Sequence, residues 1–359
     1  MGDLMSGSSS YKQLETQYGG FTVPALKIKI NGFDVIKTMD LAVKELSVTL
    51  SMKSAGCAVI KIAGLYDEKN HEFQSGVTSK FKLGTVVTIE LGYLSSTEMV
   101  FKGYIDMLGV DFNEENLLVV TLMDARRLMM LGGKKHVLHD VKNYSDAVKT
   151  VLGKYSQVCS AKVDATSDSL AKPVSQTTND YDFITRELIS AGKTDREFFI
   201  VADTAYFRKA PTSASPAVTL RYGRELKSLR VDFSYLDLKI DAVGYNPAEQ
   251  VSVTASETVK SFLSMSKVVT PTPVLTVAAA DADSQEKAAV RAGQLARQWQ
   301  DKSCVGSGTS AGLPMIVPGR FVKVEALEAM LNNNYYITEV THVVDEDGYL
   351  THFEIGGVR

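Results

Sequence analysis

The sequence predicts a mainly β protein with an α+β insertion in its middle. Three observations lead to this fold class. Alternating β-branched strands fill the first and last thirds of the 359 residues, helical periodicity is concentrated in the middle third, and one strand pattern occurs twice. The two copies are GTVVTIELGY, residues 84–93, and GRFVKVEALE, residues 319–328. We therefore expect a duplicated β unit that the insertion interrupts.

Short strands joined by turns dominate the first third of the chain. LKIKINGFDVI, residues 26–36, alternates around Asn31-Gly32, a dipeptide that tolerates the positive φ angles of a tight hairpin. KELSVTLSM, residues 44–52, places its leucines and valine on one face. We expect a flexible N-terminus over residues 1–19 and then a barrel or sandwich over 20–133.

The middle, residues 134–214, is expected to form the α+β insertion. NYSDAVKTVLGKY, 143–155, is predicted to be a helix with Ser145 as its N-cap. NDYDFITRELISAG, 179–192, is predicted to be a second helix that Asn179 or Asp180 caps and Gly192 ends. The following EFFIVADTAYFRKA alternates as a hairpin, which we expect to turn at Asp203-Thr204.

Strands return over residues 215–359, where we expect the second barrel. A flanking helix is predicted over about 283–300, with Asp283 and Glu286 forming an acidic first turn of the capping-box type. The chain ends in a hairpin with DEDG, 345–348, at its tip, which matches NEEN, 113–116, in the first third.

Equal spacing supports the duplication. Nineteen residues separate Gly84 from Gly103 and also Gly319 from Thr338, and the two registers then differ by about three residues at the second hairpin. One interpretation is that any two β-meanders look alike. The other is a duplicated barrel, in which case a ring of three chains presents six similar units, because heterologous contacts that close form cyclic rings.

Composition excludes several classes of protein. The net charge is −3 and there is no basic run, which argues against binding nucleic acid by neutralising its phosphates. No apolar stretch reaches the 18 residues of a membrane span, and the N-terminus lacks a signal peptide pattern. Cys57, Cys159 and Cys304 are far apart and odd in number, so we expect reduced thiols in a cytosolic product.

Three groups of residues resemble ligand sites at first sight. Gly306, Gly308 and Gly312 have the spacing of a phosphate loop, but a helix precedes them and a strand follows, so we interpret the segment as a flexible loop. His136 and His139, with Asp140, would need further ligands to bind a metal, and we interpret them as a surface segment. The acidic turns at 113–116 and 345–348 are too short for calcium loops and are interpreted as hairpin tips.

No catalytic group emerges from the carboxylates. Asp180 and Asp182 lie in a first helical turn, where negative charge favours the helix dipole, and Arg186 pairs with Asp182 at i+4. Glu187 follows on the same helix, and Trp299 is interpreted as a packing anchor. We therefore assign no catalytic, cofactor-binding or metal-binding residue, expect no cofactor, and predict that the protein is not an enzyme.

The order of these elements resembles a known family. FDVIKTMDLAVKELSVTL, FKGYIDMLGVDF, NDYDFITRELISAG, VTLRYGRELKSLRVDFSYLDLKIDAVGYNP and the closing YYITEVTHVVDEDGYLTHFEI occur in its order and spacing. The chain is similar to the baseplate hub proteins of contractile phage tails, the late-control gene D family. It also resembles the N-terminal hub region of type VI secretion spike proteins.

This resemblance implies two tube-like β-barrels with an α/β domain between them, and a homotrimer around a central channel. It implies a structural protein that adapts a sixfold tail tube to a threefold spike in a virion or injection particle made in the bacterial cytoplasm. The implied partners are the tail tube protein, a spike and, further out, tape measure and baseplate wedge proteins. Because the sequence continues into no spike domain after residue 359, we expect a separate spike protein.

Two other functions stay open at this point. One is a cell-wall-degrading enzyme of the same apparatus, which would need a cleft with paired carboxylates or a metal. The other is a monomeric carbohydrate- or receptor-binding β-protein. The mass in solution separates the hub from the monomeric binding protein.

Overall fold

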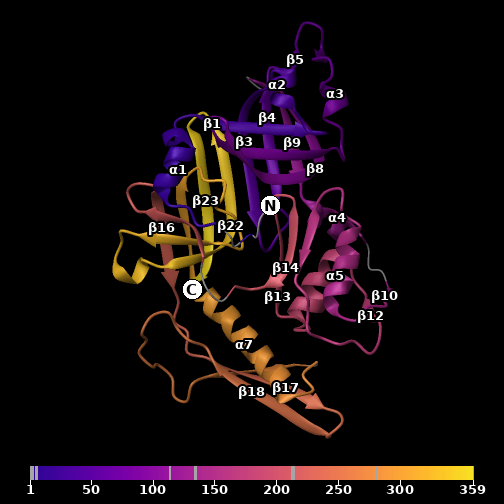
Figure 1. The fold of residues 1–359 in the computed structure, drawn as a ribbon, viewed down its shortest axis with the longest axis vertical. Helices are drawn as coiled ribbons and strands as arrows, with labels where there is room; N and C mark the ends of the chain where they lie inside the picture. Colours follow the sequence, from indigo (N-terminus) through magenta and orange to yellow (C-terminus); the bar gives the residue numbers. More distant parts are fainter. Residues whose placement is uncertain are drawn as a thin grey trace.

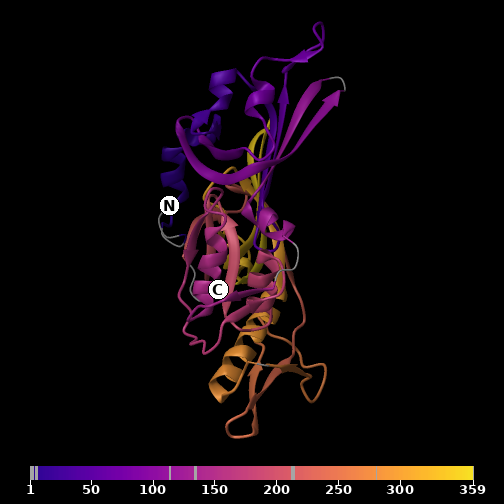
Figure 2. The ribbon, with the colours of Figure 1, turned by 90° about the vertical axis from the view of Figure 1, so that its right-hand side faces the viewer.

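The computed structural model describes residue 4 and residues 7–112, 115–132, 136–211, 215–279 and 281–358. The molecule is elongated, with the first third of the chain at one end and α7 with its small sheet at the other (Figures 1 and 2). The middle third packs along one side of the long axis. Residues 133, 134 and 214, where the insertion was predicted to begin and end, lie outside the described residues.

The first third is built mainly of strands. Its longer strands are β1 Pro24–Ile30, β3 Ala42–Ser51, β4 Cys57–Ala63, β7 Val86–Tyr93, β8 Ser96–Phe112 and β9 Asn116–Met123. Its short elements are α1 Tyr11–Gln17, a 3-10 turn at Gly19–Phe21, β2 Phe33–Asp34, α2 Val35–Met39, β5 Tyr66–Asp67, β6 Glu72–Phe73 and α3 Val77–Lys80.

The middle third mixes helices and strands, as the sequence predicted. Its elements are α4 Ala125–Leu131, β10 Val137–His139, α5 Tyr144–Gly153, β11 Ser160–Val163, β12 Val174–Gln176, α6 Asp180–Asp182 with the π-helical continuation Phe183–Ser190, β13 Arg196–Val201 and β14 Thr204–Lys209. β11, β14 and β13 form a three-stranded sheet, and the helices pack on it around buried Val148, Phe183 and Phe207.

The last third returns to strands. They are β15 Pro216–Arg221, β16 Leu226–Phe233, β17 Lys239–Asn246, β18 Val251–Thr258, β19 Val274–Ala278, β20 Cys304–Ala311, β21 Phe321–Glu325, β22 Asn334–Asp345 and β23 Gly348–Val358. The long helix α7 Gln285–Lys302 lies against β17 and β18, and a 3-10 turn spans Ala329–Leu331.

One sheet of thirteen strands joins the first and last thirds. Its order is β16-β20-β23-β22-β3-β4-β9-β8-β7-β1-β2, with β21 beside β22 and β15 beside β21. The mainly β class with an α+β part is confirmed. Separate closed barrels are not what the strand pairs form, because within the described residues no ladder closes this sheet and β22 pairs directly with β3.

Several predicted turns and caps are confirmed and others shift by one or two residues. Asn31 and Gly32 have φ angles of 53° and 82° in the two-residue turn between β1 and β2. Asn179 caps α6 as predicted. The cap of α5 is Asn143 and not Ser145, because the Asn143 side chain accepts the hydrogen bond from the third residue of the helix. The β13–β14 turn occupies residues 202–203, where the prediction was Asp203-Thr204.

Two further local predictions were wrong. The N-cap of α7 is Ser284, whose hydroxyl accepts from the Lys287 N–H, while Asp283 forms a side-chain ion pair with Lys287. Residues 11–19 of the expected flexible N-terminus form a capped helix, α1, and the turn after it. Leu14 and Tyr18 are buried there, so this segment is packed against the sheet.

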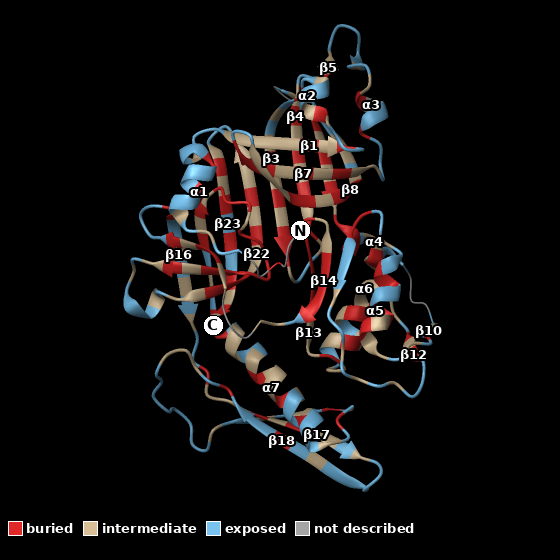
Figure 3. Cartoon of the chain, viewed as in Figure 1, coloured by how far each residue is buried: buried red, intermediate tan, exposed pale blue. Residues whose placement is uncertain are grey.

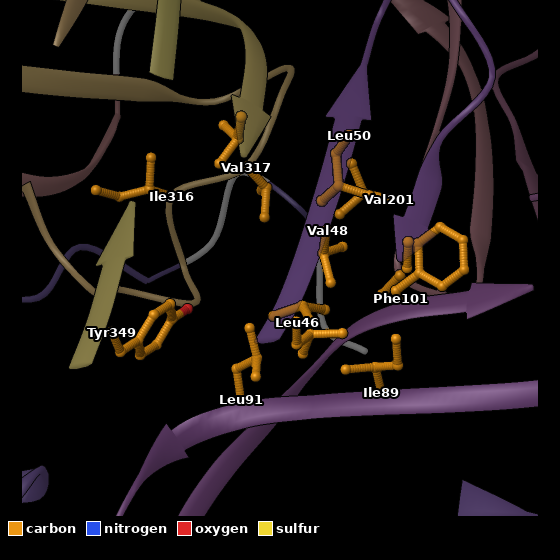
Figure 4. Packing of buried hydrophobic residues seen from close by; sticks show 14 of the residues in the cluster. Leu46, Val48, Leu50, Ile89, Leu91, Phe101, Val201, Ile316, Val317 and Tyr349 are labelled. Atoms are coloured by element: carbon orange, nitrogen blue, oxygen red, sulfur yellow. The ribbon is translucent and has the colours of Figure 1, made fainter. Parts of the chain in front are cut away.

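The main hydrophobic core lies inside the curl of the large sheet. β1 and β7 cross in front of β3, β4 and β9, and the buried residues concentrate where these layers face each other (Figures 1 and 3). Leu46 of β3 lies between Leu91 and Ile89 of β7 in this core, and Leu50, further along β3, lies beside Val201 (Figure 4). In contrast, β18 is largely exposed (Figure 3).

Candidate functional site

Two groups of six strands follow the same order in the large sheet. The first is β3-β4-β9-β8-β7-β1 and the second is β16-β20-β23-β22-β21-β15. In chain order, β1, β3, β4, β7, β8 and β9 correspond to β15, β16, β20, β21, β22 and β23. We call the first group repeat 1 and the second repeat 2. The predicted duplication is therefore present as a duplicated strand order.

Both repeats begin their central hairpin with the same backbone geometry. Gly84 and Gly319 have φ angles of 83° and 79°, a conformation that favours glycine. The Gly84 N–H donates to the Ile105 carbonyl at 2.8 Å, and the Gly319 N–H donates to the Ile337 carbonyl at 2.9 Å. Ile105 and Ile337 donate back to the residue after each glycine, at 3.0 and 2.9 Å. Gly84 and Gly319, which precede the two similar strands in the sequence, thus occupy equivalent positions in the structure.

Irregularities in the strand ladders also coincide. The β3–β4 ladder shifts register after Val43 and the β16–β20 ladder after Leu226. The β8–β9 ladder shifts after Ile105 and the β22–β23 ladder after Ile337. Bulges re-aim a strand at a defined point. Their coincidence makes a chance likeness of two meanders an inadequate explanation.

The strand register corrects the spacing inferred from sequence. Val87 pairs with Gly103, and the equivalent Val322 pairs with Tyr335, so Gly103 corresponds to Tyr335 and not to Thr338. The three-residue difference lies in the loop between the first two strands of each meander. The second hairpins keep nearly the same register.

One strand breaks the correspondence. β1 runs antiparallel to β7, whereas β15 runs parallel to β21. The other four pairings inside each repeat are antiparallel in both.

Repeat 1 and repeat 2 meet at a seam between β3 and β22. The pairs run from Glu339 opposite Ser51 to Val344 opposite Leu46. On the core face of the seam, Leu46, Val48 and Val340 are at most 1 % exposed. The seam therefore buries the edge of repeat 1 as completely as a central strand.

A buried histidine lies in this seam. His342 is opposite Val48, and its Nδ1 lies 3.0 Å from the Tyr349 hydroxyl and 3.1 Å from the Thr351 hydroxyl. Burial lowers the pKa of His342 to about 3, because the charged form would lose its hydration. The imidazole is thus held neutral at the centre of the joined sheet.

The other end of β3 is held by a buried ion pair. Asp124 accepts hydrogen bonds from the Gly56 N–H at 2.7 Å and from Arg126 Nε at 2.9 Å. Arg126 also donates to the Ser51 carbonyl, and neither side chain is more than 2 % exposed. This cluster fixes the β3–β4 hairpin to the start of α4, so the seam register is coupled to the middle third.

A second polar cluster fixes the middle third to repeat 2. The Tyr336 hydroxyl donates to Glu197 Oε1 at 2.8 Å, and Arg208 Nε donates to the same oxygen at 2.7 Å. Arg208 also donates to the Gly319 carbonyl and lies over the Phe199 ring. Burial, followed by the charge of Glu197, raises the pKa of Tyr336. These contacts hold the middle third against repeat 2.

The strands that correspond to β3 and β22 lie at the outer ends of the two repeats. In the part of the chain that the structure describes, they lack a pairing equivalent to the one between β3 and β22. β16 corresponds to β3, and residues 107–112 of β8 correspond to 339–344 of β22. Within the described residues, β16 has a ladder only to β20, and this part of β8 has one only to β9. Val110 and Phe112 are 42 % and 58 % exposed. The sequence pattern of both segments does not distinguish them from interior strands.

The glycine-rich segment 305–319 proves not to be a flexible loop. Gly306 and Gly308 lie in β20, an interior strand of the sheet. A Cβ on Gly308 would lie 2.4 Å from the Phe353 ring, and one on Gly312 would lie 2.1 Å from the Tyr349 ring. Aromatic rings packed on the backbone explain Gly308 and Gly312, whereas a Cβ on Gly306 would lie 2.1 Å from the Arg230 carbonyl of β16.

The histidine pair is separated by the fold. β10 is a strand, so His136 and His139 do not share a helix face. His139 is buried, stacks on Phe183 and bonds to Gln176 at 2.8 Å, which corrects its interpretation as a surface residue, while His136 is exposed. Asp140 is exposed beside them. Across the described residues no cluster of three metal-ligand side chains is present.

The acidic turn at 345–348 is a hairpin tip, as we interpreted it. Asp345 pairs with Gly348 at the tip of the β22–β23 hairpin. In the other turn, 113–116, Asn113 and Glu114 lie outside the described residues.

The carboxylates of the α6 region are engaged in local structure. Asp180 accepts from Gln176, Lys154 and Tyr155, and these hydrogen bonds lower its pKa although burial opposes them. Glu187 accepts from the Thr178 hydroxyl at 2.6 Å, and hydrogen bonds of this kind outweigh burial and lower its pKa too. Arg186 pairs with Asp182 at 3.1 Å as predicted.

Trp299 and the cysteines complete the predicted set. Trp299 is 38 % exposed with Lys302 over its ring, so it is not the buried packing anchor that we expected. All three cysteines are free thiols, with Cys159 and Cys304 buried.

An open cleft of about 900 Å³ lies between the middle third and repeat 2; Thr185, Glu197 and Asp232 contribute to its lining. Glu197 already accepts hydrogen bonds from Tyr336 and Arg208.

Solved structures with this fold are phage tail proteins and their relatives. The chain is similar to the tail protein from Neisseria meningitidis MC58, with TM-score 0.67, 12 % identity and coverage of 93 % of this chain and 96 % of that one. It is similar to the 43 kDa tail protein of prophage MuSo2 from Shewanella oneidensis, with TM-score 0.66, 15 % identity and coverage of 93 % and 98 %.

A third similar structure comes from a secretion system. The E. coli c3393 protein, described as a component of the type VI secretion system with structural similarity to the T4 bacteriophage tail proteins gp27 and gp5, has TM-score 0.58 and 13 % identity. The match covers 92 % of this chain and 76 % of that one. The resemblance noted in the sequence is therefore confirmed at the level of the fold: this chain has the fold of phage tail proteins and of a type VI secretion component.

The family follows from a sequence comparison. Residues 21–346 match the model of the family described as the Alg8 N-terminal domain, and the chain belongs to that family. No curated protein matches the sequence. Among the helices of the described residues, none has both the length and the apolar character needed to cross a bilayer.

Proposed function

We propose that this protein is the structural hub of a contractile injection particle. In this proposal three chains form a ring around a central channel, and the ring joins a sixfold tail tube to a threefold spike. The observation that carries it is the duplicated strand order, because three chains with two repeats each place six similar units in one ring. The fold shared with tail proteins supports the same function.

The proposed division of labour follows the three parts of the chain. Residues 20–133 and 215–359 each supply one repeat of a tube-like barrel, which is completed only in the ring. Residues 134–214 form the α+β domain beside it. An assembly of this kind should bury more than roughly 2,000 Å² per interface and be partly apolar.

The proposed partners are those of a hub. A tail tube protein stacks on one face of the ring and a separate spike protein binds the other, with tape measure and baseplate wedge proteins as further contacts. The similarity to a type VI secretion component supports a place in such an apparatus. The proposed location is the baseplate of a virion or injection particle assembled in the bacterial cytoplasm.

The mass of the protein in solution tests this proposal. The chain has a mass of 39.1 kDa, so a trimer should have a mass of about 117 kDa in native mass spectrometry or light scattering. The measurement is made on the protein alone and after co-expression with a spike protein from the same source. Monomers in both preparations would overturn the hub proposal, and a ring with a central channel in electron micrographs would support it.

No specific observation favours the other two functions. A cell-wall-degrading enzyme would need free carboxylates or a metal cluster facing a cleft. The candidate carboxylates Asp180, Asp182 and Glu187 are engaged in local hydrogen bonds or ion pairs, so we propose that the protein is not an enzyme. Release of soluble peptidoglycan fragments by the purified protein would contradict this. A monomeric binding protein would have a mass of 39.1 kDa under every condition.

A further inference from the structure

We infer that β16 of one chain pairs antiparallel with residues 107–112 of β8 in a second copy of the same chain. This inference rests on the proposed ring and names the strands that close it. Its basis is the seam inside one chain, where β3 and β22 already make the equivalent contact.

The register of this contact follows from the aligned repeats. Because the bulges and ladder positions coincide, Leu46 corresponds to Leu229 and Thr49 to Asp232 through their partners in β4 and β20. In the same way, Val340 corresponds to Leu108 and Val344 to Phe112. Transferring the β3–β22 pairs gives the following pairs between copies: Phe233 opposite Leu108, Asp232 opposite Gly109, Val231 opposite Val110, Arg230 opposite Asp111 and Leu229 opposite Phe112.

The core face of the inferred contact is apolar on both sides. Leu229, Val231 and Phe233 correspond to the buried stripe Leu46, Val48 and Leu50, but in the single chain they are only partly covered. On β8, Val110 and Phe112 are exposed. An unpaired strand edge with an apolar face is the kind of surface that proteins cover. A second copy covers both stripes with the packing that β3 and β22 show.

The other face is charge-complementary. Arg230 is exposed on β16 and is placed opposite Asp111, which is exposed on β8. Opposite charges that face each other across antiparallel strands stabilise the pairing, whereas like charges oppose it. Gly109 is opposite Asp232 and leaves room for that side chain. A single copy cannot make this contact within itself, because β16 and β8 lie at separate places in the sheet order with β20, β23, β22, β3, β4 and β9 between them.

A disulfide cross-link tests the register directly. Residues opposite each other in an antiparallel ladder have Cα atoms about 4.5–5.5 Å apart, within the range that a disulfide spans. In the full chain carrying Asp111→Cys and Arg230→Cys, mild oxidation should therefore give covalent dimers and closed trimers on a non-reducing gel. Each single variant, and the unsubstituted chain with its three native cysteines, should stay monomeric on that gel.

A matched out-of-register variant sharpens the test. Asp111→Cys with Asp232→Cys moves one cysteine two positions along the same face, beyond disulfide reach in the inferred register. Preferential cross-linking of this variant would overturn the register. If the particles have the mass of a trimer but Asp111→Cys with Arg230→Cys does not cross-link, the inferred pairing is wrong while the hub proposal stands. If no trimer forms even with the spike, the hub proposal itself fails.

Charge reversal gives a second measurement that needs no oxidation. Asp111→Arg alone and Arg230→Asp alone should each raise the protein concentration for half-maximal assembly by about tenfold, because a like-charge pair then occurs at every contact of the ring. The double variant should restore assembly, while the circular dichroism spectra of all three stay unchanged. Assembly by the single variants at the original concentration would contradict the inferred contact.

Discussion

The hydroxyls of Thr49 and Thr341 lie 3.1 Å apart across the seam, although 292 residues separate them in the sequence. Their strands, β3 and β22, belong to different repeats and form one continuous sheet. The edge of repeat 1 is therefore closed by the last part of the chain. This relationship makes the stability of the two repeats interdependent.

Truncation of the seam should destabilise the whole protein. Leu46 is fully buried opposite Val344, so Leu46→Ala should lower the free energy of unfolding by about 2–5 kcal/mol through lost burial and a residual cavity. Urea denaturation followed by circular dichroism measures this. Val251→Ala, at a 47 % exposed position of β18, is the control and should change stability by less than about 0.5 kcal/mol. Equal effects of the two variants would contradict the seam as a core element.

Acid should destabilise the protein through His342. Its pKa is lowered from 6.5 to about 3 in the folded chain, so below pH 6.5 the unfolded chain binds a proton that the folded chain does not. The associated stability is complete above pH 6.5 and is lost progressively as the pH falls toward 3. The loss between pH 7 and pH 5 should be about 2 kcal/mol.

A variant isolates this contribution. His342→Val carries the residue of the corresponding position, Val110, and cannot titrate. Its stability should fall less steeply than that of the unsubstituted protein between pH 7 and pH 5 in urea titrations at each pH. Parallel slopes would show that His342 is not held neutral in the folded state.

A methyl group on β20 should not be tolerated. Gly308→Ala places a Cβ 2.4 Å from the Phe353 ring, so the free energy of unfolding should fall by about 1–3 kcal/mol as the ring or the strand moves. Gly293→Ala is the matched control, because Gly293 lies in α7 with nothing within 4 Å of the added Cβ. That change should raise stability by up to about 1 kcal/mol. Thermal melting of both variants decides the sign of each effect.

Removal of one partner of the buried ion pair should be far more costly than removal of an exposed one. Asp124→Ala leaves the Arg126 guanidinium buried without its carboxylate and should cost about 3–5 kcal/mol. Asp283→Ala breaks the exposed pair with Lys287 at 2.7 Å and should cost less than about 1 kcal/mol. Similar costs in chemical denaturation would mean that the Asp124 cluster does not hold the β3–β4 hairpin.

Local features were predictable from the sequence because their causes are local. Asn31-Gly32 specifies its turn by the φ angles that these residues tolerate. Gly84 and Gly319 were recognised as equivalent starts because each precedes an alternating strand. Segment 304–311 failed as a strand prediction because its glycines and serines lack β propensity. A Cβ on Gly308 would meet the Phe353 ring of β23, and one on Gly306 would meet the Arg230 carbonyl of β16, so the partner strands explain these glycines.

The candidate site was not predictable, because alternation gives the two faces of a strand and not its neighbour. Nothing in the residues around Thr49 indicates a partner near Thr341. The exposed stripe on β8 and the half-covered stripe on β16 have the same pattern as buried strands, so only their places in the sheet distinguish them. Charged residues of α6 and the histidine pair His136 and His139 have the chemistry of a site, but Asp180 and His139 serve as local hydrogen-bond partners in the fold.

The β3–β22 pairing also has a consequence for biosynthesis. A ribosome that adds 5–20 residues per second needs roughly 15–60 s to make the chain between Thr49 and Thr341. Throughout that interval the nascent polypeptide exposes the apolar edge of β3, because β22, the strand that covers it, has not yet been translated. Cells that produce this protein in quantity must therefore shield the growing chain from its neighbours on the same polysome.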